Sequence, residues 1–343
     1  MVYLFYLYNR MKKSKIKLSL AIILILFILY CLSFLLNFSK DNIKWGVTFS
    51  AKYAQSELGL NWQETYLAIL DDLKVNNIRL SAYWDEIEAN RDVYNFESLD
   101  WQIKEADNRH VNIILAVGRR LPRWPECHDP SWLINLSPEE TSQEQLELVD
   151  LVVKRYKNIP SITTWQIENE PYLGTFGLCP KLDEKTFKQE IAITREISPK
   201  PVLITDSGEL NFWIMAARTG ADIVGSTLYR AVYNEKIGYI KYHIPPVFYF
   251  AKASFIKTIF KTKSVINAEL QTEAWHTEKK DLSQMTIEES SKSMDVNQFK
   301  SNITFAQKAG FDDIYLWGVE WWYFLKVKHG NSDIWDEAKK IWQ

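Results

Sequence analysis

Short apolar runs alternate with amphipathic stretches from residue 43 to residue 343. We interpret eight of the runs as buried strands, at 45–49, 77–82, 111–117, 162–168, 202–205, 221–227, 264–269 and 313–317. The amphipathic stretches predict helices at 61–74, 99–108, 137–156, 184–197, 210–219, 247–261, 295–308 and 332–342. Strands that alternate with helices are typical of parallel sheets with helical crossovers. The pattern therefore predicts an α/β fold, a (β/α)8 TIM barrel over residues 43–343. An open doubly wound sheet is the alternative, and it is less favoured because no Gly-x-Gly-x-x-Gly follows the first strand.

A second pattern precedes the barrel. Residues 1–17 contain five basic and no acidic residues, and residues 18–36 then run without a charge. A helix over 18–36 would be about 28 Å long, close to the hydrocarbon thickness of a bilayer. We expect a cytoplasmic tail at 1–17, a transmembrane signal-anchor helix at 18–36, a linker at 37–42 and a domain outside the cytoplasm. A cleaved signal peptide is the rival interpretation, but the run is long and no small-residue cleavage site follows it.

Net charge and cysteine content limit which partners and cofactors the sequence predicts. The net charge of −2 argues against nucleic acid, because phosphate binding needs a basic surface. Cys127 and Cys179 fall in loops after neighbouring predicted strands, and both a disulfide and two free thiols remain open. His128 is the only histidine near them and no metal-ligand spacing occurs, so we expect no metal.

The stretch 236–263 combines lysines with aromatic residues and contains no acidic residue. An ordinary barrel helix with a solvated basic face would explain it. A face that lies against an anionic membrane is the alternative interpretation.

Candidate chemistry gathers at the predicted carboxyl ends of the strands, where the catalytic residues of barrels lie. Glu170 and Glu269 would meet there from two strands. Two such carboxyl groups are what cleavage of a glycosidic bond needs, because one must donate a proton while the other is ionised. Other polar and aromatic side chains at strand ends are Arg79, Asn169, Tyr229 and Trp317.

Several of these segments together resemble clan A of the glycoside hydrolases, the superfamily of cellulases, mannanases and β-galactosidases. The sequence Trp-Gln-Ile-Glu-Asn-Glu-Pro at 165–171 is similar to the clan's strand with the acid/base glutamate. The segment 266–271 resembles its nucleophile strand, and 78–80, 83–84, 87–88 and 316–318 resemble other strand ends and their flanks.

The resemblance implies a retaining β-glycosidase that needs no metal or organic cofactor. Glu170 would be the acid/base and Glu269 the nucleophile, kept ionised by Arg79 and Tyr229. Asn169 would donate to the sugar 2-hydroxyl, and Trp317 would form the floor of the sugar site.

Further residues are assigned with alternatives left open. Trp84, Trp124 and Glu320 are candidate substrate contacts, Glu273 is a rival nucleophile, and Glu168 is expected to support the site. The arginine-rich loop 118–126 would bind an acidic or substituted sugar, or pair with Glu126 and Asp129. A transglycosylase and a silent carbohydrate-binding barrel are the alternative functions.

Overall fold

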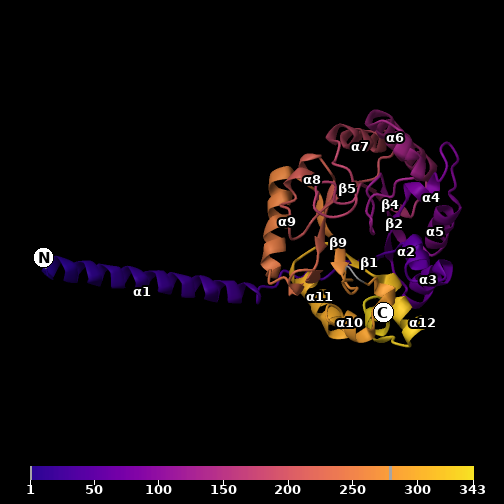
Figure 1. Cartoon of the computed structure of the whole chain (residues 1–343). Helices are drawn as coiled ribbons and strands as arrows, with labels where there is room; N and C mark the ends of the chain where they lie inside the picture. The colour runs from indigo at the N-terminus through magenta and orange to yellow at the C-terminus, as the bar shows by residue number, and fades with distance from the viewer. Residues whose placement is uncertain (1, 278–279) are drawn as a thin grey trace.

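The computed structural model describes residues 2–277 and 280–343, and it describes side chains at Lys15 and from Lys17 onward within these ranges. Helix α1 (Val2–Ser33) precedes the barrel and extends away from it (Figure 1). Among the residues that the structure describes, no helix is both long enough and apolar enough to cross a membrane. The anchor at 18–36 stays a prediction from the sequence.

Eight parallel strands close into a barrel in the order β1-β10-β9-β6-β5-β4-β3-β2. Each strand pairs with the barrel strand that precedes it in the chain, and the last closes against the first. This topology confirms the predicted (β/α)8 class. The strands are β1 (Lys44–Thr48), β2 (Asn77–Ser81), β3 (Asn112–Val117), β4 (Ile162–Ile167), β5 (Val202–Asp206), β6 (Ile223–Leu228), β9 (Ser264–Gln271) and β10 (Asp313–Trp317).

Helices surround the barrel (Figure 1). The α-helices after α1 are α2 (Ala51–Ser56), α3 (Trp62–Ala68), α4 (Trp84–Ile87), α5 (Glu97–Asn108), α6 (Pro138–Tyr156), α7 (Glu184–Ile197), α8 (Ile214–Arg218), α9 (Pro246–Phe260), α10 (Ile287–Ser291), α11 (Val296–Lys308), α12 (Val319–His329) and α13 (Asp333–Lys339). Three short turns of other helix types are η1 (Ile69–Leu73, π), η2 (Ser131–Asn135, 3-10) and η3 (Leu282–Gln284, 3-10). Ser137 and Glu140 form the expected capping box at the start of α6.

The short helices α2, α4, α10, η2 and η3 were not predicted from the sequence, and neither were two further elements. Helix α12 follows β10 directly, and Trp321, Trp322 and Phe324 are buried along it together with Glu320. Because its buried positions lie on no single stripe, no amphipathic period marks it. The second is a hairpin of β7 (Ala231–Asn234) and β8 (Gly238–Lys241) after β6.

The basic and aromatic stretch 236–263 contains β8, the second strand of this hairpin, and α9. Lys252 is buried, donates to the carbonyl of Gly208 at 2.7 Å and lies 4.0 Å from the Trp213 ring centre. Tyr249 is also buried and donates to Glu209 at 2.6 Å. Lys252 and Tyr249 therefore face the protein interior, as in an ordinary barrel helix. Contact of the exposed face of the stretch with a membrane stays a prediction from the sequence.

The barrel interior is filled rather than open. Ile114, Leu203, Ile266 and Tyr315 pack against one another in a buried cluster. Gly46 makes this packing possible, because a Cβ at that position would lie 2.6 Å from the Tyr315 ring. With the interior filled by side chains, as is general for this fold, polar chemistry is confined to the mouth at the carboxyl ends of the strands.

Candidate active site

Glu269, in β9, is held by two partners from other strands. Arg79 in β2 donates to its Oε1 at 2.9 Å, and the hydroxyl of Tyr229, just after β6, donates to Oε2 at 3.0 Å. Arg79 is fully buried and Glu269 nearly so. A buried carboxylate needs such a charged partner, and the pair favours the ionised form of Glu269. The hydroxyl of Tyr229 remains a donor because burial and the charge of Glu269 raise its pKa.

Glu170 lies in a contrasting environment just after β4. Its backbone has a φ of 44°, and its amide donates to the Thr205 hydroxyl at 2.9 Å. The side chain is buried, and Oε1 has no hydrogen-bond partner among the described residues. Burial first, and then the negative charge of Glu269, raise the pKa of Glu170 well above its usual range. Burial and the neighbouring negative charge therefore favour the protonated form of Glu170, whereas Glu269 is paired with Arg79.

Asn169 is fixed by partners on both ends of its amide. Its oxygen accepts from Arg79 Nη2 at 2.7 Å and from the Thr205 hydroxyl at 3.1 Å. Its nitrogen donates to Glu126 Oε2 at 3.0 Å. The amide is thus oriented with its oxygen toward Arg79, and one N–H remains to donate to a ligand.

Arg123, from the loop after β3, lies between the rings of Tyr53 and Trp317. The guanidinium carbon is 3.9 Å from the Tyr53 ring centre and 4.2 Å from that of Trp317. It donates to Glu273 at 2.6 Å and to Glu320 at 2.7 Å. Arg123 therefore covers one face of the Trp317 indole.

A cleft of about 300 Å³ opens at this mouth. Its aromatic wall comes from four loops, those after β3, β4, β6 and β9. Trp124 packs edge-on against Phe176 at 5.7 Å between ring centres, and Tyr229 packs likewise against Trp275 at 5.4 Å. Trp124 is 56% exposed and lines the cleft. The candidate residues that line the cleft are Glu170, Glu269, Tyr229, Trp317 and Trp124.

Arg79 and Asn169 lie directly behind the residues that line the cleft. Arg79 donates hydrogen bonds to Glu269 and to Asn169. Glu320 is fully buried, accepts from the Ser50 amide at 2.6 Å and acts on the cleft through Arg123. Trp84 lies elsewhere, and its assignment as a substrate contact is corrected. It is fully buried in the core, donates to Glu88 at 2.9 Å and packs against Trp132, because α4 turns it under the barrel wall.

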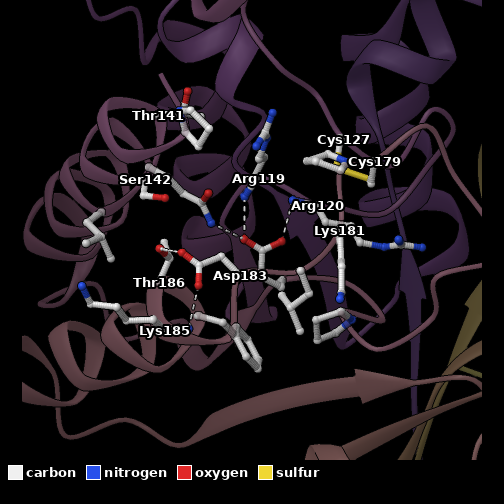
Figure 2. A pocket seen from close by; sticks show the side chains of 18 of the residues that line it. Arg119, Arg120, Cys127, Thr141, Ser142, Cys179, Lys181, Asp183, Lys185 and Thr186 are labelled. Carbon is white, nitrogen blue, oxygen red and sulfur yellow. Dashed lines mark hydrogen bonds between the residues drawn. A yellow bond between two sulfur atoms is a disulfide. The ribbon is translucent and has the colours of Figure 1, made fainter. Parts of the chain in front are cut away.

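Glu168 supports the site from outside the cleft. Its backbone φ is 57°, and its carboxylate accepts from the amides of Arg119 and Arg120 at 2.8 and 2.6 Å. The carboxylate borders a separate cavity of about 810 Å³ between α6 and α7, where Arg119 and Arg120 also lie (Figure 2). Gly118 permits this contact, since a Cβ there would lie 2.4 Å from Glu168 Oε1.

Cys127 and Cys179 form a disulfide at the edge of the same cavity (Figure 2). The bond joins the loop after β3, which carries Trp124, to the loop after β4, which carries Phe176. Of the two states left open by the sequence, the structure has the disulfide. It connects the two loops that form one side of the aromatic wall.

Two cleft residues, Arg123 and Glu126, were not assigned individual roles from the sequence, and Glu273 was considered only as a rival nucleophile. Glu126 and Arg123 lie in an arginine-rich loop whose acidic residues also fit surface ion pairs, and Glu273 follows the strand end by two residues. The many charged residues in the loop 118–126 were the one sign in the sequence that this loop takes part in the site. Loop residues follow no period, so the sequence pattern does not tell which of their side chains point into the cleft. No group of three or more His, Cys, Asp or Glu able to hold a metal occurs within 2–277 and 280–343.

The sequence matches no family model, and no curated protein resembles it. Solved structures do resemble the fold. Xylanase 10B from Thermotoga petrophila, in complex with xylobiose, is 15% identical over 81% of this chain and 82% of its own, with a TM-score of 0.54. The family 1 β-glucosidase from Thermotoga maritima is 11% identical over 82% of this chain and 89% of its own, with a TM-score of 0.52. A β-galactosidase from Halorubrum lacusprofundi is 13% identical over 80% of this chain and 52% of its own, with a TM-score of 0.53. At these identities the likeness shows the fold, and the chain therefore shares the barrel architecture of glycoside hydrolases.

Proposed function

We propose that this protein is a retaining β-glycoside hydrolase that cleaves an oligo- or polysaccharide by double displacement. The observation that carries the proposal is the contrast between two buried carboxyl groups at one cleft. Glu269 is paired with Arg79 at 2.9 Å, whereas Glu170 has a raised pKa and an unpartnered Oε1. A glycosidase needs this division of one acid and one carboxylate. The barrels similar to it include a xylanase, a β-glucosidase and a β-galactosidase, which supports a carbohydrate ligand.

In the first step Glu269 attacks the anomeric carbon while Glu170 donates its proton to the leaving oxygen. Tyr229 and Arg79 hold the attacking carboxylate in place. The negative charge of Glu269 is consumed in the glycosyl-enzyme, so the electrostatic cause of the raised Glu170 pKa disappears. Glu170, now a carboxylate, accepts a proton from the water that attacks the intermediate, and the cycle closes.

A panel of 2-deoxy-2-fluoro glycosides with activated leaving groups tests this assignment. The fluorine slows the second step, so the glycosyl-enzyme accumulates and can be located by peptide mapping. We expect the label on Glu269, with the reactive member of the panel identifying the sugar. A label on Glu273 would show that the wrong carboxylate had been assigned, and no label with any sugar, together with no turnover, would favour a silent binding barrel.

Product analysis with the natural polysaccharide separates hydrolysis from transglycosylation. The same two carboxyl groups serve both reactions, and only the acceptor that attacks the intermediate differs. We expect free reducing sugar to dominate at all acceptor concentrations. Products longer than the substrate would assign the enzyme to transglycosylases.

We also propose that residues 18–36 anchor the enzyme in a membrane, with residues 1–17 in the cytoplasm and the barrel outside it. The support comes from the uncharged run and its basic flank, together with the exposed apolar side chains of α1 from Leu18 to Leu32. The full-length chain should remain in the membrane pellet after an alkaline carbonate wash, and a chain that begins at Asn37 should be released. Release of both would overturn the anchor without affecting the catalytic proposal.

A further inference from the structure

A third carboxyl group, that of Glu126, lines the same cleft as Glu170 and Glu269. It is 4% exposed and lies in the loop after β3. Its carboxyl group is not part of the proposed double displacement, although an ionised Glu126 would add to the rise of the Glu170 pKa. A buried acid beside a reacting pair needs an explanation, because burying a carboxyl group costs free energy.

The loop holds Glu126 in a strained position. Its φ is 74°, a left-handed value that is unfavourable for a residue with a side chain. Its amide donates to the Arg123 carbonyl at 2.8 Å, and its carbonyl accepts from the Leu121 amide at 2.7 Å. The next residue, Cys127, is bound to Cys179, and the loop after β4 packs so closely that a Cβ at Gly177 would lie 2.8 Å from the Glu126 Cβ. Strain maintained by this many contacts is typical of functional positions.

The two oxygens of Glu126 differ in their partners. Oε2 accepts from Asn169 Nδ2 at 3.0 Å, and the nearest arginine atom, Arg120 Nε, is 3.7 Å away, beyond hydrogen-bond distance. Oε1 accepts no hydrogen bond from the residues that the structure describes. One oxygen is thus engaged with the sugar-binding amide and the other is free for a ligand.

We propose that Glu126 is a substrate-binding and positioning residue. Its Oε1 hydrogen-bonds to a hydroxyl group of the bound sugar, while its Oε2 orients the Asn169 amide toward the neighbouring hydroxyl. This inference rests on the proposed glycosidase function and adds a specificity-determining group to it.

The charge state of Glu126 agrees with this role. Burial raises its pKa to about 8, against the opposing effect of Arg120, and the charge of Glu269 adds to the rise. Below that pH the carboxyl group is neutral and can donate its proton in a hydrogen bond to a sugar oxygen. It also avoids placing a third negative charge beside Glu269 and the leaving oxygen.

A substrate pair tests the positioning role: the 4-nitrophenyl glycoside that the protein hydrolyses fastest and its 2-deoxy analogue. Removing the 2-hydroxyl should lower kcat/KM of the native enzyme by about 10- to 100-fold, the worth of one or two hydrogen bonds. In Glu126→Ala the parent substrate should lose a similar factor, and the additional loss with the 2-deoxy analogue should shrink. Glu126→Gln, whose amide oxygen can still accept from Asn169, should keep the full difference between the substrates. The exposed Glu139→Gln on α6 is the matched control and should behave as native.

An unchanged 2-deoxy penalty in Glu126→Ala would overturn the positioning role, even if overall activity fell. The proton is tested separately, without turnover, by the melting temperature of Glu126→Gln and native protein between pH 4.5 and 9. Because the folded state holds a proton that the unfolded chain releases above about pH 4.5, the native protein should lose stability relative to Glu126→Gln as the pH rises to about 8. A pH-independent difference would show that Glu126 is ionised and would overturn its role as a donor. If no glycoside is turned over by any variant, the proposed function fails first, and the melting series still decides the charge state.

Discussion

Glu170 and Glu269 are equally buried, and what distinguishes them is hydrogen bonding. The Glu269 carboxylate accepts two hydrogen bonds, one from Arg79 and one from Tyr229. Among the described residues, Glu170 Oε1 has no hydrogen-bond partner, and Glu269 is the strongest of the negative neighbours that oppose the ionisation of Glu170. Neighbouring charges and donors, rather than depth in the barrel, therefore assign the acid and the nucleophile.

Replacement of Glu170 by Ala removes the proton donor and should slow turnover by about 10²- to 10⁴-fold. The loss should be greatest for substrates with poor leaving groups, which depend on protonation, and least for aryl glycosides with acidic phenols. Azide should restore rate with the activated substrates by attacking the glycosyl-enzyme. Equal losses across a leaving-group series, measured as kcat/KM, would contradict the acid role.

Replacement of Tyr229 by Phe deletes the hydroxyl that donates to Glu269 at 3.0 Å and leaves the ring that packs on Trp275. A hydrogen bond to a charged group contributes about 1.5–3 kcal/mol, so kcat/KM should fall by about 10- to 100-fold. Burst kinetics should place the loss in formation of the intermediate. Tyr94→Phe, at an exposed position, is the control, and a native rate in Tyr229→Phe would show that Arg79 alone suffices.

At the scale of elements, two loops decide the shape of the cleft. The loop after β3 supplies Trp124 and the loop after β4 supplies Phe176, and the disulfide and the Glu168 carboxylate connect these two loops from behind. The barrel strands position the reacting carboxyl groups, whereas these loops position the aromatic wall. A change in the loop connections should therefore alter substrate binding more than chemistry.

The double replacement of Cys127 and Cys179 by Ser tests this division. The cysteines are 52 residues apart, and loss of a disulfide that closes such a loop costs about 4 kcal/mol in the chain-entropy account. We expect a lower melting temperature and a raised KM on oligosaccharides, with kcat on a small aryl glycoside nearly unchanged at low temperature. A fall in kcat with an unchanged KM would show that the loops serve the carboxyl groups instead.

Over the whole molecule, buried titratable groups make stability depend on pH in opposite directions. His128 is buried and contacts the Arg123 carbonyl at 3.2 Å, and burial, followed by the charge of Lys52, lowers its pKa to about 4. Below about pH 6.5 the unfolded chain binds a proton at His128, whereas the folded protein binds it only near pH 4. His128 therefore lowers the free energy of unfolding as the pH falls from about 6.5 to 4. Glu126 acts in the opposite sense between about pH 4.5 and 8.

His128→Gln isolates the first effect. The difference in the free energy of unfolding between variant and native protein should change by up to about 3 kcal/mol between pH 7 and pH 4, in favour of the variant at low pH. Denaturant melts at several pH values measure it. The Asp129 carboxylate nearby partly offsets the shift, and a difference that does not vary with pH would mean that His128 titrates normally in the folded protein.

The sequence by itself determined the barrel and the residues at its mouth. Apolar runs between amphipathic stretches can bury themselves only as parallel strands under helices, and the carboxyl end of each run is then at the same rim. That logic identified the eight strands and brought Glu170, Glu269, Arg79, Asn169 and Tyr229 to one place. It needed only local patterns, because strand direction and end are local properties.

Only the tertiary structure decided which groups touch. Arg79 bridges Glu269 and Asn169, which lie 190 and 90 residues away along the chain. Trp84 entered the core although its neighbours resemble a site motif, and Glu126 entered the cleft although it lies in a charged loop. Loop side chains follow no period, and their directions are set by long-range contacts such as the disulfide. The physical reason is that a strand end is positioned by the sheet, whereas a loop residue is positioned by whatever packs against it.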